Sequence, residues 1–421
     1  MSMEGGVLAP PAEAVLSGQA SLKTRLRRAE RMRKVAAFGL VAPLLLFVIV
    51  SFAMPIAGML WRSVEDTEVS GVMPRTIAAL KSWDGRGLPS DDAFRAAAAD
   101  LSEARVKGTA SAAARRLNYD INGFRTIIMT TVRKAPAADV ADIRDALIGL
   151  DKRWGERETW AAIKRASGPL TDFYLLAAVD LQRDATGDIT RSPEDRAIYL
   201  DVLGRTFRIS LTVTLLALVL AFPVAYLMST QPAKIANILM ILVLLPFWTS
   251  LLVRTAAWVV LLQNEGLVNH LLIWLGIIDK PIRLIYNSIG VHVAMTHVLL
   301  PFMILPLYST MKAIKPHYMR AAVSLGAPPA VAFLRVYLPQ CLPGIAAGCL
   351  LVFILAIGYY ITPALVGGAG DQMLSYFIAF YTTDSVNWGM ASALGAVLLA
   401  TTMILYGVYS RLVGGGAIKM G

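Results

Sequence analysis

Six long apolar runs separate the polar segments of this chain. They are Ala36–Trp61, Thr206–Met228, Ile235–Leu252 (with an extension over Val253–Leu262), Ile289–Thr310, Pro343–Ile361 and Trp388–Tyr409. About 20 apolar residues are needed to cross the hydrocarbon core of a bilayer, and within lipid a segment must satisfy its own backbone hydrogen bonds. The pattern therefore predicts an all-α, polytopic membrane protein with six transmembrane helices.

The charges between the runs indicate which segments face the cytoplasm, where Lys and Arg accumulate. Seven residues from Lys23 to Lys34 are basic, ahead of the first run. The segment 311–342 holds four basic residues and no acid, whereas 362–387 holds Asp371 and Asp384 and no base. We therefore expect a multi-pass protein of the bacterial inner membrane, with both termini in the cytoplasm.

The first run is too long for a signal peptide, whose apolar region spans about 7–15 residues, so we expect a retained helix. The predicted segments are a cytoplasmic basic segment 1–35, a first transmembrane helix 36–61, an insert 62–204, a five-helix core 205–411 with a cytoplasmic loop 312–342, and a cytoplasmic tail 412–421.

The insert between Arg62 and Gly204 differs in composition from the apolar runs on either side of it. It holds 21 basic and 22 acidic residues, so it is about as charged as a soluble protein. Start signals such as Ser90-Asp91-Asp92, and apolar residues at helical spacing in 136–150, predict helices. Long loops translocate largely regardless of their charge, so we expect a soluble, mainly helical domain on the periplasmic side.

The composition and net charge of the chain indicate which kind of partner it contacts. The chain is 56% hydrophobic and 16% charged, with a formal net charge of +11. Because the insert is close to neutral, the positive excess lies beside the apolar runs. It therefore indicates contact with membrane lipid and an inside-facing topology, and it does not indicate nucleic acid.

No catalytic or metal-binding pattern is present in the sequence. It lacks a phosphate-binding GxxxxGK[ST] loop, an HExxH motif and a GxSxG motif. His292 and His297 do not share a helix face, and Cys341 and Cys349 lie in one apolar run without metal-type spacing. We therefore expect no catalytic residue, no metal and no enzymatic activity on this chain.

The loop after the fourth apolar run is the segment that says most about function. Pro316 can begin a helix, and small residues at 321–322 leave one face of that helix open to close approach. Gly326 can adopt the positive φ that ends a helix, and the prolines that follow prevent its continuation. A second short helix then runs to Leu338-Pro339. The sequence predicts a helical hairpin suited to docking into a groove on a partner.

This loop resembles the "EAA" loop of binding-protein-dependent ABC importer permeases, whose pattern is Glu-Ala-Ala, three residues, Gly, and later a hydrophobic-Pro pair. The matching positions are Arg320, Ala321, Ala322, Gly326, Ala327, Phe333, Leu338 and Pro339. Arg320 stands where the family has glutamate, which removes a negative charge and suggests a compensating charge on the partner.

Other stretches resemble the spermidine/putrescine-type permeases of that family. Leu245–Trp258 is similar to their third helix and its extension, and Arg205–Thr214 with Phe222–Tyr226 is similar to their second. The resemblance covers 36–61 and 205–411 but not the insert.

The resemblance implies a type I importer fold and a set of partners. The loop around Ala321–Ala327 would be a coupling helix in a cleft of a cytoplasmic ABC ATPase dimer. ATP and Mg would be bound by that ATPase, and this chain would hold no cofactor. A periplasmic substrate-binding protein would deliver the substrate, and a second permease subunit, with a heterodimer favoured, would complete the path.

Five residues near the ends of the runs are candidates for the translocation path: Trp248, Arg254, Trp258, Tyr359 and Tyr360. Acids and aromatic faces favour a cation, but the predicted spans contain no Asp or Glu. The aromatic residues also fit an interfacial belt. Arg254 would repel a cation and is better interpreted as an interface or gate residue, so we expect the binding protein to set most of the selectivity.

A secondary transporter, a channel and a non-transporting scaffold are the alternatives. A secondary transporter usually shows intramembrane ionisable residues and an internal repeat, and neither is visible. For an importer, another organic cation, an amino-acid derivative or an organic anion is the alternative substrate. The role of the insert is open, and contact with the binding protein or with the second permease is our hypothesis.

Overall fold

The computed structural model describes residues 12–417, apart from 135, 137–139 and 185–186. The first eleven residues of the expected N-terminal segment and the last four of the expected tail lie outside this range, as does part of the expected helix start at 136–139. The chain divides into two units, Met1–Trp61 and Arg62–Gly421, each described by itself.

The first unit is one long helical stretch. It consists of α1 (Ala12–Val48), a π-helical turn (Ile49–Ala53) and α2 (Met54–Arg62). From Glu30 to Arg62 it is apolar enough to cross a membrane, and its apolar window has no buried residue. This stretch contains the predicted first span.

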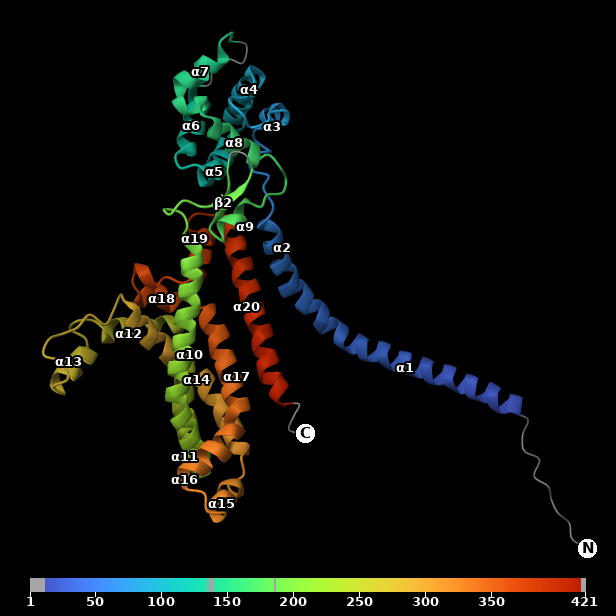
Figure 1. The fold of residues 1–421 in the computed structure, drawn as a ribbon, viewed down its shortest axis with the longest axis vertical. Helices are drawn as coiled ribbons and strands as arrows, with labels where there is room; N and C mark the ends of the chain where they lie inside the picture. The colour runs from blue at the N-terminus through green and yellow to red at the C-terminus, as the bar shows by residue number, and fades with distance from the viewer. Residues whose placement is uncertain (1–11, 135, 137–139, 185–186, 418–421) are drawn as a thin grey trace, which may run out of the picture. The chain divides into compact units, whose positions relative to one another are not determined.

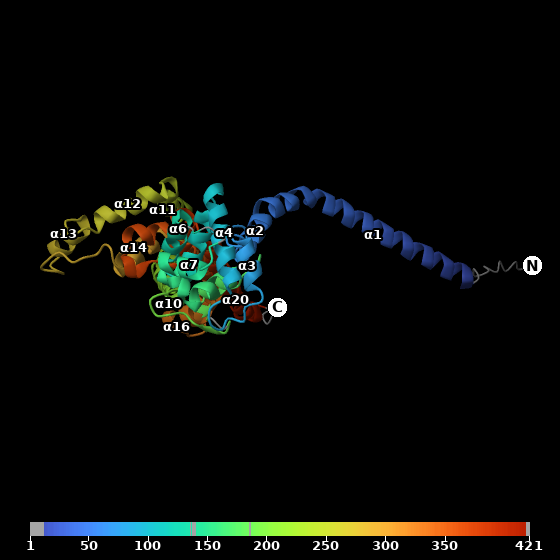
Figure 2. The ribbon, with the colours of Figure 1, turned by 90° about the horizontal axis from the view of Figure 1, so that it is seen from above.

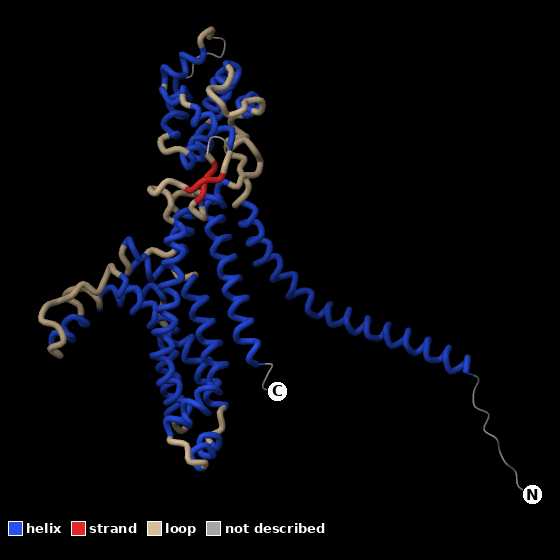
Figure 3. Tube along the Cα trace, in the orientation of Figure 1, coloured by secondary structure: helices blue, strands red, loops and turns tan. Residues whose placement is uncertain are grey.

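The second unit begins with the insert, which is helical apart from one short hairpin (Figure 3). Its elements are α3 (Pro74–Leu80), α4 (Asp91–Lys107), α5 (Ala110–Asp120), α6 (Phe124–Lys134), α7 (Ile143–Leu150), a 3₁₀ turn (Lys152–Gly155), α8 (Arg157–Arg165), α9 (Phe173–Ala177), β1 (Leu181–Arg183) and β2 (Ile189–Arg191). The two strands are antiparallel, with Gln182 opposite Thr190.

The insert has its own core, built around Trp154 and Trp160. Their ring centroids lie 5.1 Å apart, and Phe94 lies 4.5 Å from Trp160. Both indole N–H groups are satisfied, by the Thr131 hydroxyl and by the Trp154 carbonyl, each at 2.9 Å. Large rings with paired N–H groups stabilise a fold of this size, so the insert is a folded domain.

The rest of the second unit consists of long apolar helices with shorter elements between them. They are α10 (Tyr199–Thr230), α11 (Ala233–Leu244), a 3₁₀ turn (Leu245–Trp248), α12 (Leu251–Leu261), α13 (Leu267–Trp274), α14 (Ser288–Ala313), α15 (His317–Ser324), α16 (Pro329–Ala332), a π-helical turn (Phe333–Tyr337), α17 (Leu338–Ile357), α18 (Ile361–Val366), a 3₁₀ turn (Ala369–Asp371), α19 (Leu374–Thr383) and α20 (Trp388–Ala417).

The described residues contain five helices long and apolar enough to span a membrane, and a sixth span if the bent pair α11–α12 counts as one. The all-α, six-span prediction is therefore confirmed. The third span differs from its prediction, because its two halves meet at 97°. Pro246 has no N–H for a helical hydrogen bond, and the backbone is extended at Thr249 and Ser250.

Helices α10, α14 and α17 pack closely through small residues (Figure 1). A Cβ on Gly344 would lie 2.6 Å from the Thr310 hydroxyl, and one on Gly348 would lie 2.7 Å from the Met303 sulfur. Within membranes small residues let helix backbones approach, and van der Waals contact then holds the helices together. These contacts fix α17 against α14.

Two predictions about helix boundaries are wrong. The second helix of the hairpin does not end at Leu338-Pro339, and the fifth span does not begin at Pro343 and end at Ile361. One apolar helix runs from Pro329 to Ile357. Its π-turn explains why Pro339 does not end it: the Leu338 N–H reaches back five residues to the Phe333 carbonyl. The widened turn gives room for the proline ring, which otherwise collides with the carbonyl four residues before it.

The insert is joined to the spans by specific contacts. Asp180, after α9, accepts hydrogen bonds from the backbone N–H groups of Tyr199 (2.9 Å) and Leu200 (2.8 Å), and so caps the start of α10. This cap explains why α10 begins at Tyr199, inside the predicted insert range, instead of at Thr206. At the same junction the Tyr174 ring packs on Gly389 at the start of α20.

Replacing Gly389 with Ala should loosen this junction. The new Cβ would lie 2.4 Å from the Tyr174 ring, and that side chain is buried and cannot move aside. We expect a loss of about 1–3 kcal/mol, typical of overpacking. The measurements are the thermal unfolding midpoint of the purified chain and the protease sensitivity of 62–204. Gly395→Ala is the matched control, since nothing lies within 4 Å of its Cβ. Equal midpoints for the two variants would contradict the prediction.

Candidate functional site

The predicted hairpin is present, and its turn is a Schellman motif. Helix α15 ends where the Gly326 N–H bonds to the Val323 carbonyl (2.9 Å) and the Ala327 N–H to the Ala322 carbonyl (3.1 Å). Gly326 has φ +89°, in the left-handed region that favours glycine. The chain then turns into α16, so two short helices meet at a glycine-dependent tip.

The tip of the hairpin is exposed and partly apolar. Leu325 is 89% exposed, and Tyr318 and Val323 are also exposed large side chains. Arg320 is exposed beside them and makes no ion pair with any residue that the structure describes. Apolar side chains next to an unpaired charge, at the end of a rigid hairpin, form a surface able to dock on another protein.

The remaining hairpin residues singled out from the sequence lie behind the tip. Ala321 is exposed and Ala322 half-buried in α15, and Ala327 closes the turn. Leu338 and Pro339 form the first turn of α17, beyond the π-turn. The structure therefore places Arg320 and Gly326 at the tip, Ala321, Ala322 and Ala327 directly behind it, and Leu338 and Pro339 at the base.

An aromatic cluster that sequence reasoning missed attaches the hairpin to α10. The rings of Phe333 and Tyr337 stack at 5.4 Å, and Tyr226 meets them edge-on at 5.8 and 5.5 Å. Phe222, one turn before Tyr226, meets Phe333 at 6.2 Å. Such pairs contribute about 0.5–1.5 kcal/mol each beyond area burial. The i, i+4 spacing of Phe222 and Tyr226 was the available signal, but it did not identify the partner.

The path candidates lie at breaks in the spans. At the bend between α11 and α12, Arg254 Nη2 donates to the Thr249 carbonyl at 3.2 Å. Arg254 is also within electrostatic range of His297 and Tyr359. Its Nε is buried and has no hydrogen-bond partner among the described residues. Arg254 thus stabilises the broken backbone and adds a positive charge to this part of the spans.

Two further contacts hold α12 in place. Trp258 Nε1 donates to His297 Nδ1 of α14 at 3.1 Å, which requires the Nδ1 atom to be unprotonated. The hydroxyls of Thr255 and Thr362 lie 3.2 Å apart and link α12 to α18. Trp258, Arg254 and Tyr359 are therefore brought together.

Trp248 and Tyr360 do not join this group. Trp248 is 77% exposed at the bend, and Tyr360 is 42% exposed in the break between α17 and α18. Beyond α12, α13 and the loop that follows it extend away from α10 and α14 in both views (Figure 1, Figure 2). This arm exposes Leu267, Trp274 and Ile277, and buried Asn269 ties its ends by bonding to the Gln263 and Ile282 carbonyls at 3.0 Å.

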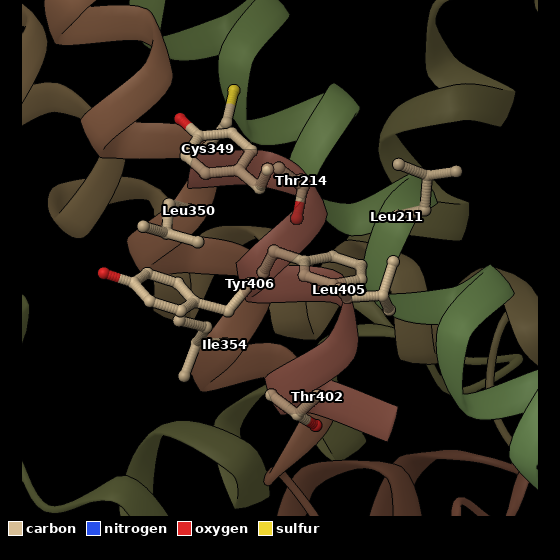
Figure 4. Close-up of a pocket in the computed structure, with 10 residues that line it drawn as sticks. Leu211, Thr214, Cys349, Leu350, Ile354, Thr402, Leu405 and Tyr406 are labelled. Carbon is tan, nitrogen blue, oxygen red and sulfur yellow. The ribbon is translucent and has the colours of Figure 1, made fainter. Parts of the chain in front are cut away.

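A cavity of about 230 Å³ lies between α10, α17 and α20 (Figure 4). The hydroxyls of Thr214 and Thr402 in its lining each donate to a carbonyl one turn earlier in the same helix. Tyr406 and Tyr409 also line the cavity, and the Tyr409 hydroxyl has no hydrogen-bond partner among the described residues. None of the path candidates lines it. Cys349 lines it as a small apolar side chain.

No group of three or more His, Cys, Asp or Glu residues in the described part of the chain is placed to hold a metal ion. His297 bonds to Trp258, and His292 lies one turn from Ser288, to which its ring is hydrogen-bonded.

Residues 214–414 match the family model described as binding-protein-dependent transport system inner membrane component. The spermidine/putrescine transport system permease protein PotB of Escherichia coli (strain K12) is 34% identical over 214 residues, which cover 51% of this chain and 78% of that protein. PotB of Haemophilus influenzae is 37% identical and covers 51% of this chain and 75% of that protein. Among solved structures, a chain of a bacterial alginate ABC transporter in complex with its periplasmic protein has a TM-score of 0.43 and 16% identity, over 51% of this chain and 77% of that one.

Replacing Phe333 with Ala should loosen the hairpin without unfolding the spans. The change removes the ring that contacts Phe222, Tyr226 and Tyr337, for an expected local loss of about 1.5–4.5 kcal/mol over the three pairs. Hydrogen exchange at 315–337 should become faster, and exchange in α14 should stay the same. Leu334→Ala is the control, because Leu334 is 59% exposed. Unchanged protection in the Phe333 variant would show that the cluster does not hold the hairpin.

Proposed function

Because this chain belongs to the family of binding-protein-dependent transport system inner membrane components, we propose that it imports spermidine, putrescine or a related polyamine. It is a multi-pass inner-membrane permease and a transport subunit. The observation that carries the polyamine assignment is 34–37% identity to spermidine/putrescine permeases over three quarters of their length. A secondary transporter or channel is not favoured by this relationship.

The hairpin and the insert face opposite sides of the membrane in this proposal. The insert caps α10 at Tyr199, and the aromatic cluster holds the hairpin near the other end of α10, at Phe222 and Tyr226. The loop 312–342 is basic, which supports a cytoplasmic hairpin and cytoplasmic termini. The insert 62–204 then lies in the periplasm.

The hairpin tip is the proposed contact with a cytoplasmic ABC ATPase dimer, which would bind ATP and Mg. Its exposed apolar residues and its rigid glycine turn support docking into a cleft. Arg320 adds a positive charge, so we propose an acidic residue on the ATPase surface opposite it. Closure of the ATPases would move the hairpin, and the aromatic cluster would pass that motion to α10.

A second permease subunit and a periplasmic binding protein complete the proposed assembly. The exposed apolar arm formed by α13 and the loop after it offers contact area for a second permease, and we favour a heterodimer. The insert offers a rigid surface for the binding protein, since it is fixed to α10 and α20. With Arg254 in the spans and no acid there, we propose that the binding protein sets most of the selectivity.

Cells that depend on this protein should take up labelled putrescine only with a working ATPase. The chain should co-purify with an ABC ATPase, and uptake should fall to background when that ATPase cannot hydrolyse ATP. Uptake that persists with the ATPase disabled would overturn ATP coupling. Uptake of neither putrescine nor spermidine, with normal assembly, would overturn the polyamine assignment.

Replacing Gly326 with Val should uncouple the transporter. Valine is β-branched and strained at φ +89°, so the Schellman turn should be lost. We expect transport-coupled ATPase activity to fall about tenfold or more, as expected from about 1–3 kcal/mol of backbone strain. Gly326→Asn is the control, because Asn tolerates the left-handed region and the space around this position is open. Normal coupling in the Val variant, at normal expression, would rule out this role for the turn.

A further inference from the structure

Arg254 lies inside the third apolar run, and the described residues give it no counter-charge. It forms no ion pair with any of them, and its guanidinium bonds to an uncharged group, the Thr249 carbonyl, at 3.2 Å. The six apolar runs of the chain contain no Asp or Glu. A charged side chain at membrane depth is costly unless it is paired, so this charge calls for a partner outside the spans of this chain.

The side chains near Arg254 do not supply that partner. Trp258, one turn later in α12, donates to His297 Nδ1 at 3.1 Å, which places this part of α12 well inside the apolar run of α14. His297 and Tyr359 are within electrostatic range of Arg254. An imidazole whose Nδ1 accepts a hydrogen bond and a phenol both lack negative charge. The positive charge of Arg254 therefore stays uncompensated in this chain.

The backbone beside Arg254 is unsuited to face lipid. The two halves of the third span meet at 97°, and Thr249 and Ser250 between them are extended and exposed in this chain. Helix α12 then begins without a side-chain cap, so its first N–H groups lack an acceptor within the helix. Irregular backbone at membrane depth occurs only against protein or in a water-filled cavity. Another subunit or water therefore covers this bend.

The side chains at the bend favour protein over water. Trp248, Leu252 and Val253 are large apolar side chains, and all three are exposed in this chain. Water would leave this apolar area unburied, whereas a protein surface would bury it. An apolar surface around one unpaired guanidinium has the character of a protein interface, where Arg and Trp are the residues that contribute most to binding.

We propose that the second permease subunit covers this bend and that a carboxylate of that subunit pairs with Arg254. The proposal rests on the proposed function, which supplies both the second subunit and the polyamine. Because the spans of this chain hold no acid, that carboxylate is also the group that attracts an ammonium of the substrate within the membrane. Arg254 occupies the carboxylate before the substrate arrives, and the ammonium displaces it. The guanidinium is thus a tethered competitor of the substrate.

The first test exchanges the charges in the complex that co-purifies with this chain. Arg254→Glu should lower the amount of second permease that co-purifies about tenfold or more, because two like charges then meet at the interface. Exchange of the opposing acid for Lys in the second permease should restore co-purification of the Glu variant. Arg208→Glu is the matched control, since it reverses the charge of another exposed arginine, in α10, and should co-purify as the parent does.

Three outcomes of this test would overturn the ion pair. One is a second permease with no Asp or Glu in its apolar runs, and another is a complex built from two copies of this chain, whose runs hold no acid. The third is that no acid-to-Lys exchange restores the Glu variant. If Arg254→Glu alone fails to fold, the combined variant still decides.

The second test measures the displacement. Arg254→Met removes the competing charge and keeps an apolar side chain of similar length. Putrescine should bind to the Met complex in lipid nanodiscs about tenfold or more tightly than to the parent complex, measured by equilibrium dialysis, because its ammonium no longer competes for a charge-assisted bond. A merely structural role for Arg254 would leave binding unchanged or weaken it, and either result would overturn the displacement.

Putrescine uptake by cells separates this proposal from the proposed function. Uptake by the parent together with failed charge exchange contradicts the ion pair alone. Successful charge exchange in a complex that takes up neither putrescine nor spermidine supports the ion pair and contradicts polyamine import.

Discussion

Lipid offers the backbone no hydrogen-bond partner, so every break in a transmembrane helix must be repaired by the protein itself. At the bend after Leu244, the Thr249 hydroxyl bonds to the Pro246 carbonyl at 2.9 Å, and Arg254 bonds to the Thr249 carbonyl. At the break after Ile357, the Ser375 hydroxyl bonds to the Tyr359 carbonyl at 2.7 Å. These repairs gather polar side chains at the breaks. The path candidates Arg254 and Tyr359 therefore lie beside breaks in the spans.

Helix α10 connects the insert with the hairpin, the two distinctive features of this permease. The carboxylate of Asp180 caps α10 at the insert, and the Phe222 and Tyr226 rings hold the hairpin near its other end. Along its length, buried alanines let α10 pack against α14 and α17 as a rigid element. A displacement of the hairpin must therefore be transmitted to α10 or absorbed at the π-turn Phe333–Tyr337. The insert follows α10, because Asp180 of the insert caps that helix.

The sequence was sufficient for the fold class, because apolar run length and flanking charge reflect the bilayer directly. It also predicted the glycine turn, because few residues other than Gly adopt φ +89°. It could not predict the cap at Tyr199, since Asp180 is nineteen residues away in the chain. It misplaced the end at Pro339, because the π-turn that accommodates the proline depends on packing of Phe333 and Tyr337 against α10. The buried ion pairs of Arg116 with Asp66 and of Arg165 with Asp120 join residues far apart in the chain, so no local pattern marks them.

The distribution of acidic residues along the chain follows the cost of burying a charge in lipid. A carboxylate within the bilayer is expensive, and the predicted spans contain none. Acids lie instead in the insert, where Asp195, for example, is exposed to solvent and the cost of its charge is small. Arg254, within the spans, disfavours a cation that stays there. For the proposed polyamine substrate, weak binding within the membrane favours release once the spans open, because tight binding there would slow the release.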